Sequence, residues 1–218
     1  MESSILQRHK FQQEAKANGL NYNYLSLGNL KSINTLLNSI NELPEEAWDD
    51  KTNRNNNKVH AMVKSVPIRW TWDALKRKKI TRLKNNEWYD VLEFTNIENE
   101  LQEIYEKYYG AGFIDTIILT LMPGNHTLAS HKDGGYSLMR THRTHIPLIT
   151  NKDVIFKVGD TLDSSESKHM NVGEIWEINN AKIHEVNNNG RDDRIHMIIN
   201  YYPYQGILSE TLKSATLF

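Results

Sequence analysis

A His-x-Asp pair and a later histidine give this sequence a candidate metal site. One residue separates His131 from Asp133, and His184 follows 53 residues after His131 in an apolar segment. In an extended segment, residues i and i+2 point to the same side, so His131 and Asp133 can reach one cation. Two imidazoles and one carboxylate form the facial triad of non-haem Fe(II) oxygenases, which leaves coordination positions open. The alternative is a loop histidine followed by an ordinary turn residue before Gly134.

Arg194 strengthens the metal hypothesis because it begins a strongly apolar segment that continues to Asn200. If residues 183–187 and 194–200 pair as a hairpin, Arg194 can point into the protein interior near the metal. A buried guanidinium needs an anion, and a dicarboxylate co-substrate would be a bidentate partner. The alternative is a structural salt bridge to an acid such as Glu174.

The composition restricts the chemistry further. The chain has 218 residues with no cysteine and nine histidines, so any metal must be held by nitrogen and oxygen ligands. Lys and Arg total 26 against 27 Asp and Glu, a net charge of −1. This balance argues against binding to nucleic acid or membrane through bulk charge. The basic run in residues 76–84 is interpreted as a solvated helix face, with steering of an anionic substrate or nucleic-acid binding as alternatives.

Hydrophobic periodicity predicts helices first and strands later. Apolar residues at helical spacing predict helices over 30–40 and 97–108, the second ending at Gly110. Alternating apolar segments separated by turn residues predict strands at 114–122, 142–149, 153–158, 174–178, 183–187 and 194–202. Short strands at this spacing favour an antiparallel jelly roll, with the helices on one outer face in an α+β arrangement.

We therefore expect one domain over residues 1–218. Residues 1–112 form a mostly helical support and lid region, 113–203 the β-rich core, and 204–218 a C-terminal tail. Segments 47–60 and 125–142 are candidates for lid and rim of the site. The N-terminus lacks the apolar region of a signal peptide, and no apolar stretch is long enough to span a membrane, so we expect a cytoplasmic protein. The sequence makes no prediction of oligomeric state.

Six segments together resemble the aspartyl/asparaginyl β-hydroxylase family, in matching order and spacing. They are Met122-Pro123-Gly124, His131-Lys132-Asp133, Arg143-Thr144-His145-Ile146-Pro147-Leu148, Met170-Asn171-Val172-Gly173-Glu174-Ile175-Trp176, His184-Glu185-Val186-Asn187 and Arg194-Ile195-His196. The resemblance covers a little over a third of the chain and implies a double-stranded β-helix fold. It also implies dependence on Fe(II), 2-oxoglutarate and O₂.

The resemblance assigns roles residue by residue. It implies that His131, Asp133 and His184 bind iron and that Arg194 holds the distal carboxylate of 2-oxoglutarate. It associates Arg143 and His145 with the co-substrate end of the site. We assign no role to His9, His60, His169 and His196, although His196 shares a strand face with Arg194.

The activity implied is hydroxylation of an unactivated C–H bond, with release of succinate and CO₂. The substrate would be a free amino acid, another small molecule, or an Asp- or Asn-type residue in a peptide or protein. The alternative hypothesis is a non-catalytic or differently reacting cupin-like barrel that binds a metal or small ligand.

Overall fold

The computed structural model describes residues 10, 13–48, 60, 62–71 and 79–207. Its helical segments are residues 13–19, α2 (Ile33–Ile40), the 3-10 turn η1 (Glu45–Trp48), α3 (Trp88–Val91) and α4 (Phe94–Tyr109). Its strands are β1 (Tyr24–Asn29), β2 (Lys64–Arg69), β3 (Gly112–Met122), β4 (His126–His131), β5 (His142–Ile149), β6 (Val154–Gly159), β7 (Glu166–Lys168), β8 (Glu174–Ile178), β9 (Ile183–Asn188) and β10 (Arg194–Pro203). Among these described helices, none is both long and apolar enough to cross a membrane.

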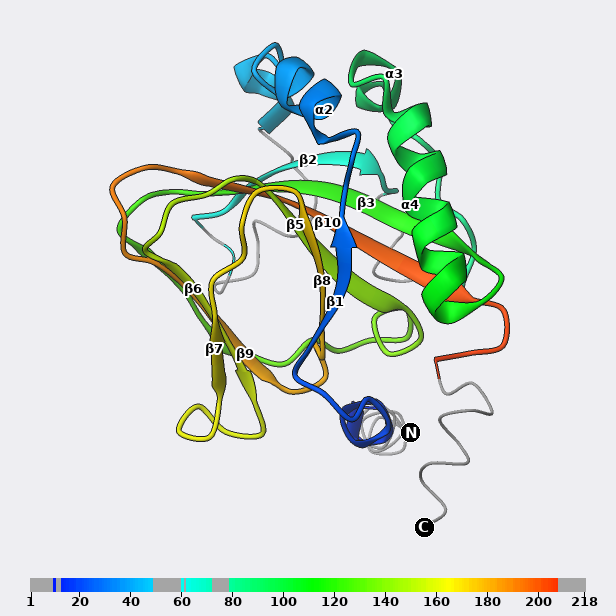
Figure 1. Cartoon of the computed structure of the whole chain (residues 1–218), viewed down its shortest axis with the longest axis vertical. Helices are drawn as coiled ribbons and strands as arrows, with labels where there is room; N and C mark the ends of the chain where they lie inside the picture. The colour runs from blue at the N-terminus through cyan, green and yellow to red at the C-terminus, as the bar shows by residue number, and fades with distance from the viewer. Residues whose placement is uncertain (1–9, 11–12, 49–59, 61, 72–78, 208–218) are drawn as a thin grey trace.

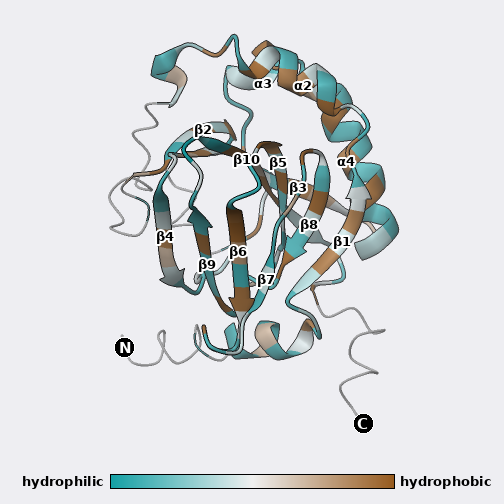
Figure 2. Cartoon of the chain, turned by 60° about the vertical axis from the view of Figure 1, so that its left-hand side comes forward, coloured by the Kyte–Doolittle hydropathy of each residue, from teal (hydrophilic) through white to brown (hydrophobic). Residues whose placement is uncertain are grey.

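Two antiparallel sheets form the core of the molecule. The larger has six strands in the order β1-β8-β5-β10-β3-β2, and the smaller has four in the order β4-β9-β6-β7. The sheets lie opposite each other, as Figures 1 and 2 show. This is the predicted double-stranded β-helix, so the α+β jelly-roll prediction is confirmed.

Helices α2 and α4 cover the outer face of the larger sheet (Figure 1). On α4, Ile97 and Leu101 are fully buried, and they belong to one apolar cluster with Ile117 and Leu119 of β3. Burial of this helix face and of alternate strand residues joins the two layers. The predicted helix end is confirmed, since α4 stops at Gly110, whose φ of 76° favours glycine.

The first half of the chain also contributes two strands that were not predicted. Strand β1 pairs with β8 and β2 pairs with β3, so both edges of the larger sheet come from residues before 112. A register shift at Gly28 and a proline at position 67 hide their period-two pattern, and sheet edges tolerate such residues. The predicted boundary at 112/113 therefore does not mark where the sheet begins. Strands β4 and β7 were also missed, because much of their length is exposed and lacks an apolar face.

The predicted hairpin between residues 183–187 and 194–200 is wrong. Strand β9 lies between β4 and β6 in the smaller sheet, whereas β10 lies between β5 and β3 in the larger one. The two strands therefore face each other across the barrel and contribute side chains to one interior from opposite walls.

Several predicted features lie wholly or partly outside the described residues. They include most of the lid segment 47–60, residues 76–78 of the basic run and most of the tail 204–218. The described part of the basic run, residues 79–84, is not helical, which contradicts the helix-face interpretation there. Arg82 from this stretch donates to Glu98 of α4 at 2.8 Å.

Candidate metal centre and co-substrate pocket

The structure brings the three candidate metal ligands together. His131 ends β4 and lies opposite His184 of β9 in the strand register, and Asp133 follows in the next loop. Ligand atoms of His131, Asp133 and His184 all lie within 4.8 Å of one another. The two imidazole rings have centroids 4.3 Å apart. The structure thus places His184 beside the pair His131 and Asp133, as the metal-site hypothesis requires.

Hydrogen bonds prepare both imidazoles for a metal. Nδ1 of His131 is 2.8 Å from the carbonyl oxygen of Ala129, and Nδ1 of His184 is 3.0 Å from that of Lys182. Because a carbonyl oxygen only accepts, Nδ1 carries a proton in each ring, so the neutral form of each imidazole has its lone pair on Nε2. Burial also lowers the pKa of His184, which favours the neutral, metal-binding form.

The Asp133 carboxylate divides its two oxygens between different partners. Oδ1 is 4.0 Å from Nε2 of His131. Oδ2 accepts a hydrogen bond from Nδ2 of Asn180 at 2.9 Å and lies 3.2 Å from Nε of Arg143. Burial works against ionisation, but the Arg143 charge and the Asn180 hydrogen bond hold the pKa of Asp133 well below its usual range. The donor set of two imidazoles and one ionised carboxylate fits Fe(II).

Next to this cluster is a cavity of about 460 Å³, counting space open to solvent. Side chains of both sheets and of neighbouring loops line it: His60, Val63, Thr120, Leu128, His131, Asp133, Arg143, His145, Phe156, His184, Val186, Arg194 and Ile198. All six predicted site residues are in this set. Their placement at one cavity is the geometry that an iron- and dicarboxylate-binding site requires.

Arg194 reaches the cavity from the larger sheet, although not through the predicted hairpin. Its side chain is buried, and the guanidinium carbon lies 4.9 Å from the ring centroid of Phe156. The alternative partner, Glu174, accepts hydrogen bonds from Asn171 and from the indole of Trp176. A cation held in this apolar wall is a strong site for a carboxylate.

His145 and Arg143, both on β5, occupy different environments within the cavity. Arg143 pairs with Asp133 and also donates to Oδ1 of Asn200 at 2.9 Å. His145 is only 6% exposed, and neither of its ring nitrogens has a hydrogen-bond partner among the described residues. Burial, helped by Arg143 and Arg194, holds the pKa of His145 well below its ordinary value. A polar ligand in the cavity would satisfy this neutral imidazole.

Sequence reasoning missed some lining residues. His60, to which no role was assigned, lies 5.4 Å from His131 in a T-shaped ring contact and lines the cavity. Thr120 also lines it from β3. A polar residue at an inward position of an apolar strand was the available signal for Thr120. For His60 the only signal was its place at the end of the candidate lid segment 47–60, because no local pattern singles out the residue itself.

Comparison with known proteins decides the family. The sequence model of the family described as aspartyl/asparaginyl beta-hydroxylase matches residues 35–203, which is more than half of the chain. The chain belongs to the aspartyl/asparaginyl β-hydroxylase family. It is a 2-oxoglutarate-dependent non-haem iron dioxygenase that uses Fe(II), 2-oxoglutarate and O₂. Membership disfavours the alternative of a non-catalytic barrel. No curated protein sequence matches the chain significantly.

Solved structures of similar fold agree with the family. A 2OG-Fe(II) oxygenase family oxidoreductase from Burkholderia pseudomallei is 14% identical, with a TM-score of 0.61 over 89% of this chain and 91% of that one. A prolyl hydroxylase from Trichoplax adhaerens, in complex with a hypoxia inducible factor peptide fragment, is 12% identical, with a TM-score of 0.59 over 99% and 97%. A Pseudomonas putida prolyl-4-hydroxylase is 9% identical, with a TM-score of 0.53 over 88% and 98%. At these identities the likeness shows the fold alone.

Proposed function

We propose that His131, Asp133 and His184 hold the catalytic iron and that Arg194 holds the distal carboxylate of 2-oxoglutarate. The observation that carries this assignment is the position of Arg194 and the three ligand candidates around one cavity. A dicarboxylate can then be held at both ends, by the metal and by the guanidinium. When bound, iron, 2-oxoglutarate and O₂ supply an oxidant that hydroxylates a C–H bond as 2-oxoglutarate becomes succinate and CO₂.

The remaining residues of the chain bind, orient and exclude water. His145 supplies a neutral imidazole for the co-substrate, and Arg143 supplies a second cation beside the metal carboxylate. Val63, Leu128 and Ile198 add an apolar wall, which strengthens the charge interactions inside.

The proposed substrate is a free amino acid or an Asp- or Asn-type residue in a short peptide or protein. The cavity combines the cations Arg143 and Arg194 with apolar side chains, and this lining suits a small substrate that carries a carboxylate.

The test is oxygen-dependent formation of succinate from 2-oxoglutarate with Fe(II), combined with a substrate screen. Free amino acids and short Asp-, Asn- and Pro-containing peptides would be examined for a mass gain of one oxygen atom. We expect His131→Ala and Arg194→Ala to abolish succinate formation. His126→Ala is the matched control, because His126 is on the same strand as His131 but does not line the cavity. Full turnover by His131→Ala or Arg194→Ala would refute the site assignment.

A further inference from the structure

The helical residues 13–19 contact the loop that carries Asp133. Nε2 of Gln13 donates to the backbone carbonyl of Asp133 at 2.6 Å. One turn later, Lys16 extends into the interior and is only 3% exposed. These contacts join segments more than 100 residues apart, and they place an N-terminal element directly behind the candidate metal ligand.

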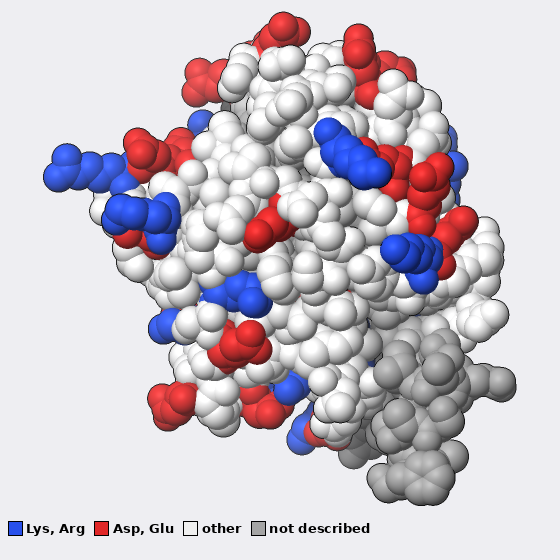
Figure 3. Space-filling view, in the orientation of Figure 1, with Lys and Arg blue, Asp and Glu red and all other residues white. Residues whose placement is uncertain are grey.

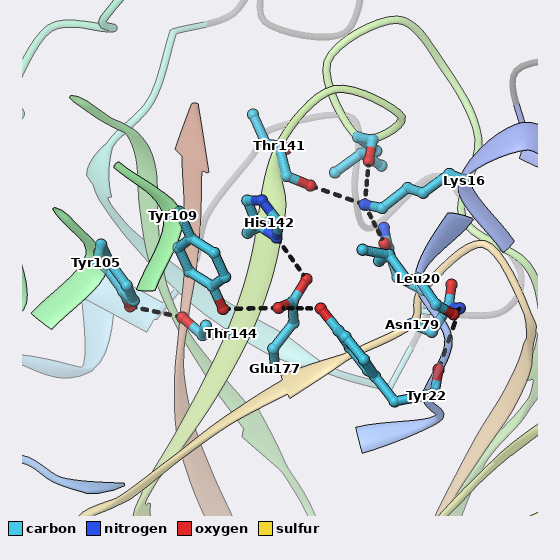
Figure 4. A network of polar contacts seen from close by, with 12 residues as sticks. Lys16, Leu20, Tyr22, Tyr105, Tyr109, Thr141, His142, Thr144, Glu177 and Asn179 are labelled. Atoms are coloured by element: carbon cyan, nitrogen blue, oxygen red, sulfur yellow. Dashed lines mark hydrogen bonds and ion pairs between the residues drawn. The ribbon is translucent and has the colours of Figure 1, made fainter. Parts of the chain in front are cut away.

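The Lys16 ammonium group is fully engaged. It donates to the carbonyl oxygens of Leu138 at 2.8 Å and Thr141 at 2.7 Å, and to Oδ1 of Asn180 at 2.6 Å. Figure 4 shows the bond from Lys16 to Thr141. Burial lowers the pKa of Lys16 to about 8, although the charges of Glu177 and Asp133 oppose this effect. Burying an ammonium group is costly, and a methionine of similar length would fill the space without that cost.

Asn180 connects Lys16 to the metal carboxylate. Its Oδ1 accepts from Lys16, and its Nδ2 donates to Oδ2 of Asp133 at 2.9 Å. An ammonium group only donates and an ionised carboxylate only accepts, so the amide between them has a single possible orientation. The positive charge also polarises the amide and strengthens the hydrogen bond that its NH₂ group donates.

The backbone reinforces this connection. The amide nitrogen of Asp133 donates to the carbonyl oxygen of Asn180 at 3.0 Å. Asn180 therefore holds Asp133 at both main chain and side chain. With Oδ2 held by Asn180 and Arg143, Oδ1 is the oxygen that lies 4.0 Å from Nε2 of His131.

We propose that Lys16 and Asn180 are positioning residues, which hold the Asp133 carboxylate in its metal-binding orientation and make the N-terminal helix part of the metal centre. The inference rests on the proposed iron site. Lys16 acts through Asn180, and neither residue touches substrate.

The experiment measures metal binding without turnover. Co(II), a spectroscopic substitute for Fe(II), is titrated into the metal-free full chain, and its visible absorption gives both the Kd and the coordination signature. The variants are Lys16→Met, Asn180→Ala and their combination. Thermal unfolding of each metal-free variant reports folding separately. Tyr22→Phe is the matched control, because it removes one partly buried hydrogen bond of the N-terminal segment, to Glu177, without touching Asp133 or Asn180.

We expect Asn180→Ala and Lys16→Met each to raise the Kd for Co(II) by about tenfold, as for loss of other residues that orient metal ligands. The double variant should match Asn180→Ala, because both changes remove the same support. Tyr22→Phe should lower the unfolding temperature and leave the Kd unchanged. Lys16→Gln also lacks the positive charge, so we do not expect it to restore the wild-type Kd for Co(II).

A folded Lys16→Met with the Kd of the wild type would overturn the inference, as would an equal rise of the Kd in Tyr22→Phe. If Lys16→Met does not fold, Asn180→Ala decides, since an unchanged Kd there also overturns it. His131→Ala separates this inference from the proposed function: if His131→Ala still binds Co(II) normally, the iron site itself is wrong. If His131→Ala loses Co(II) binding while the Lys16 and Asn180 variants keep the wild-type Kd, the iron site stands and only the positioning role is refuted.

Discussion

Arg194 and Phe156 lie on opposite sheets of the barrel, with the guanidinium carbon 4.9 Å from the aromatic ring centroid. The aromatic face supports the flat cation and screens it from water. Phe156 also stacks on His196, at 5.4 Å between centroids and 19° between planes. The proposed carboxylate-binding residue is therefore held by packing from the opposite wall.

This arrangement predicts that Arg194→Lys weakens binding of 2-oxoglutarate. Lysine keeps the charge but loses the planar fork that matches a carboxylate and stacks on a ring. We expect the KM for 2-oxoglutarate to rise about ten- to a hundredfold, the equivalent of one lost charge-assisted hydrogen bond. Succinate release measured against 2-oxoglutarate concentration checks this, with unchanged Co(II) affinity as the control. An unchanged KM would remove Arg194 from the co-substrate site.

We predict that replacing His145 changes stability and activity in opposite directions. Its two ring nitrogens are buried without hydrogen-bond partners among the described residues, a cost of about 1–3 kcal/mol for such groups. His145→Leu should therefore increase the free energy of unfolding of the metal-free protein while raising the KM for 2-oxoglutarate. Urea unfolding and the succinate assay measure the two effects. A less stable His145→Leu protein would contradict this account.

Local sequence patterns were sufficient for six of the ten described strands and for the candidate metal ligands. The i, i+2 spacing of His131 and Asp133 and the period-two alternation around His184 are local properties of the sequence, although Asp133 itself lies in the loop after β4. The sequence placed Arg194 at the cavity correctly, although the hairpin predicted for its strand is wrong. The reason is that a buried cation in an apolar strand needs an interior anion, whichever sheet carries the strand. Its real position depends on the alternation of strands between the two sheets, which no local pattern encodes.

Such local patterns could not predict contacts between segments that are far apart in the sequence. Lys16 and Asn180 are 164 residues apart, and nothing in either segment points to the other. Likewise, β1 and β2 are strands because β8 and β3 offer free edges to them. The contribution of the N-terminal region to the sheet and to the metal centre comes from tertiary structure alone.

The buried histidines should make the folded state less stable at acid pH. His196 is fully buried, and burial, helped by the positive charge of Arg194 and by the nearby His145 and His169, holds its pKa well below the ordinary value. The unfolded chain therefore binds a proton first, and stability decreases as the pH falls below about 6.5. His196→Leu should lose less stability than the wild type between about pH 7 and about pH 5, where the unfolded histidine becomes charged. Urea unfolding across this range measures the difference, and equal pH slopes would refute the prediction.

The final prediction concerns Glu177, which is fully buried on β8 of the larger sheet and whose polar contacts Figure 4 shows. Its carboxylate accepts hydrogen bonds from the hydroxyl groups of Tyr22 and Tyr109, both at 2.6 Å, and from Nδ1 of His142 at 2.8 Å. Burial works against ionisation, but the His142 contact and the two tyrosines outweigh it and hold the pKa of Glu177 below its ordinary value. The carboxylate thus ties the N-terminal segment, α4 and β5 together.

Glu177→Gln should lower the free energy of unfolding by about 3–5 kcal/mol at neutral pH, because it breaks one side of a buried charged cluster. The stabilisation by Glu177 is complete above its unfolded pKa of about 4.5 and is lost as the pH falls through the lower folded value. The gap between wild type and variant should therefore narrow below about pH 4.5. Glu166→Gln is the matched control, since Glu166 is exposed and its carboxylate makes only long contacts, 3.8 Å to Lys168 and 3.5 Å to Asn23. It should change stability by less than about 0.5 kcal/mol. A Glu177→Gln protein as stable as Glu166→Gln in urea at neutral pH would show that the buried cluster does not hold these segments together.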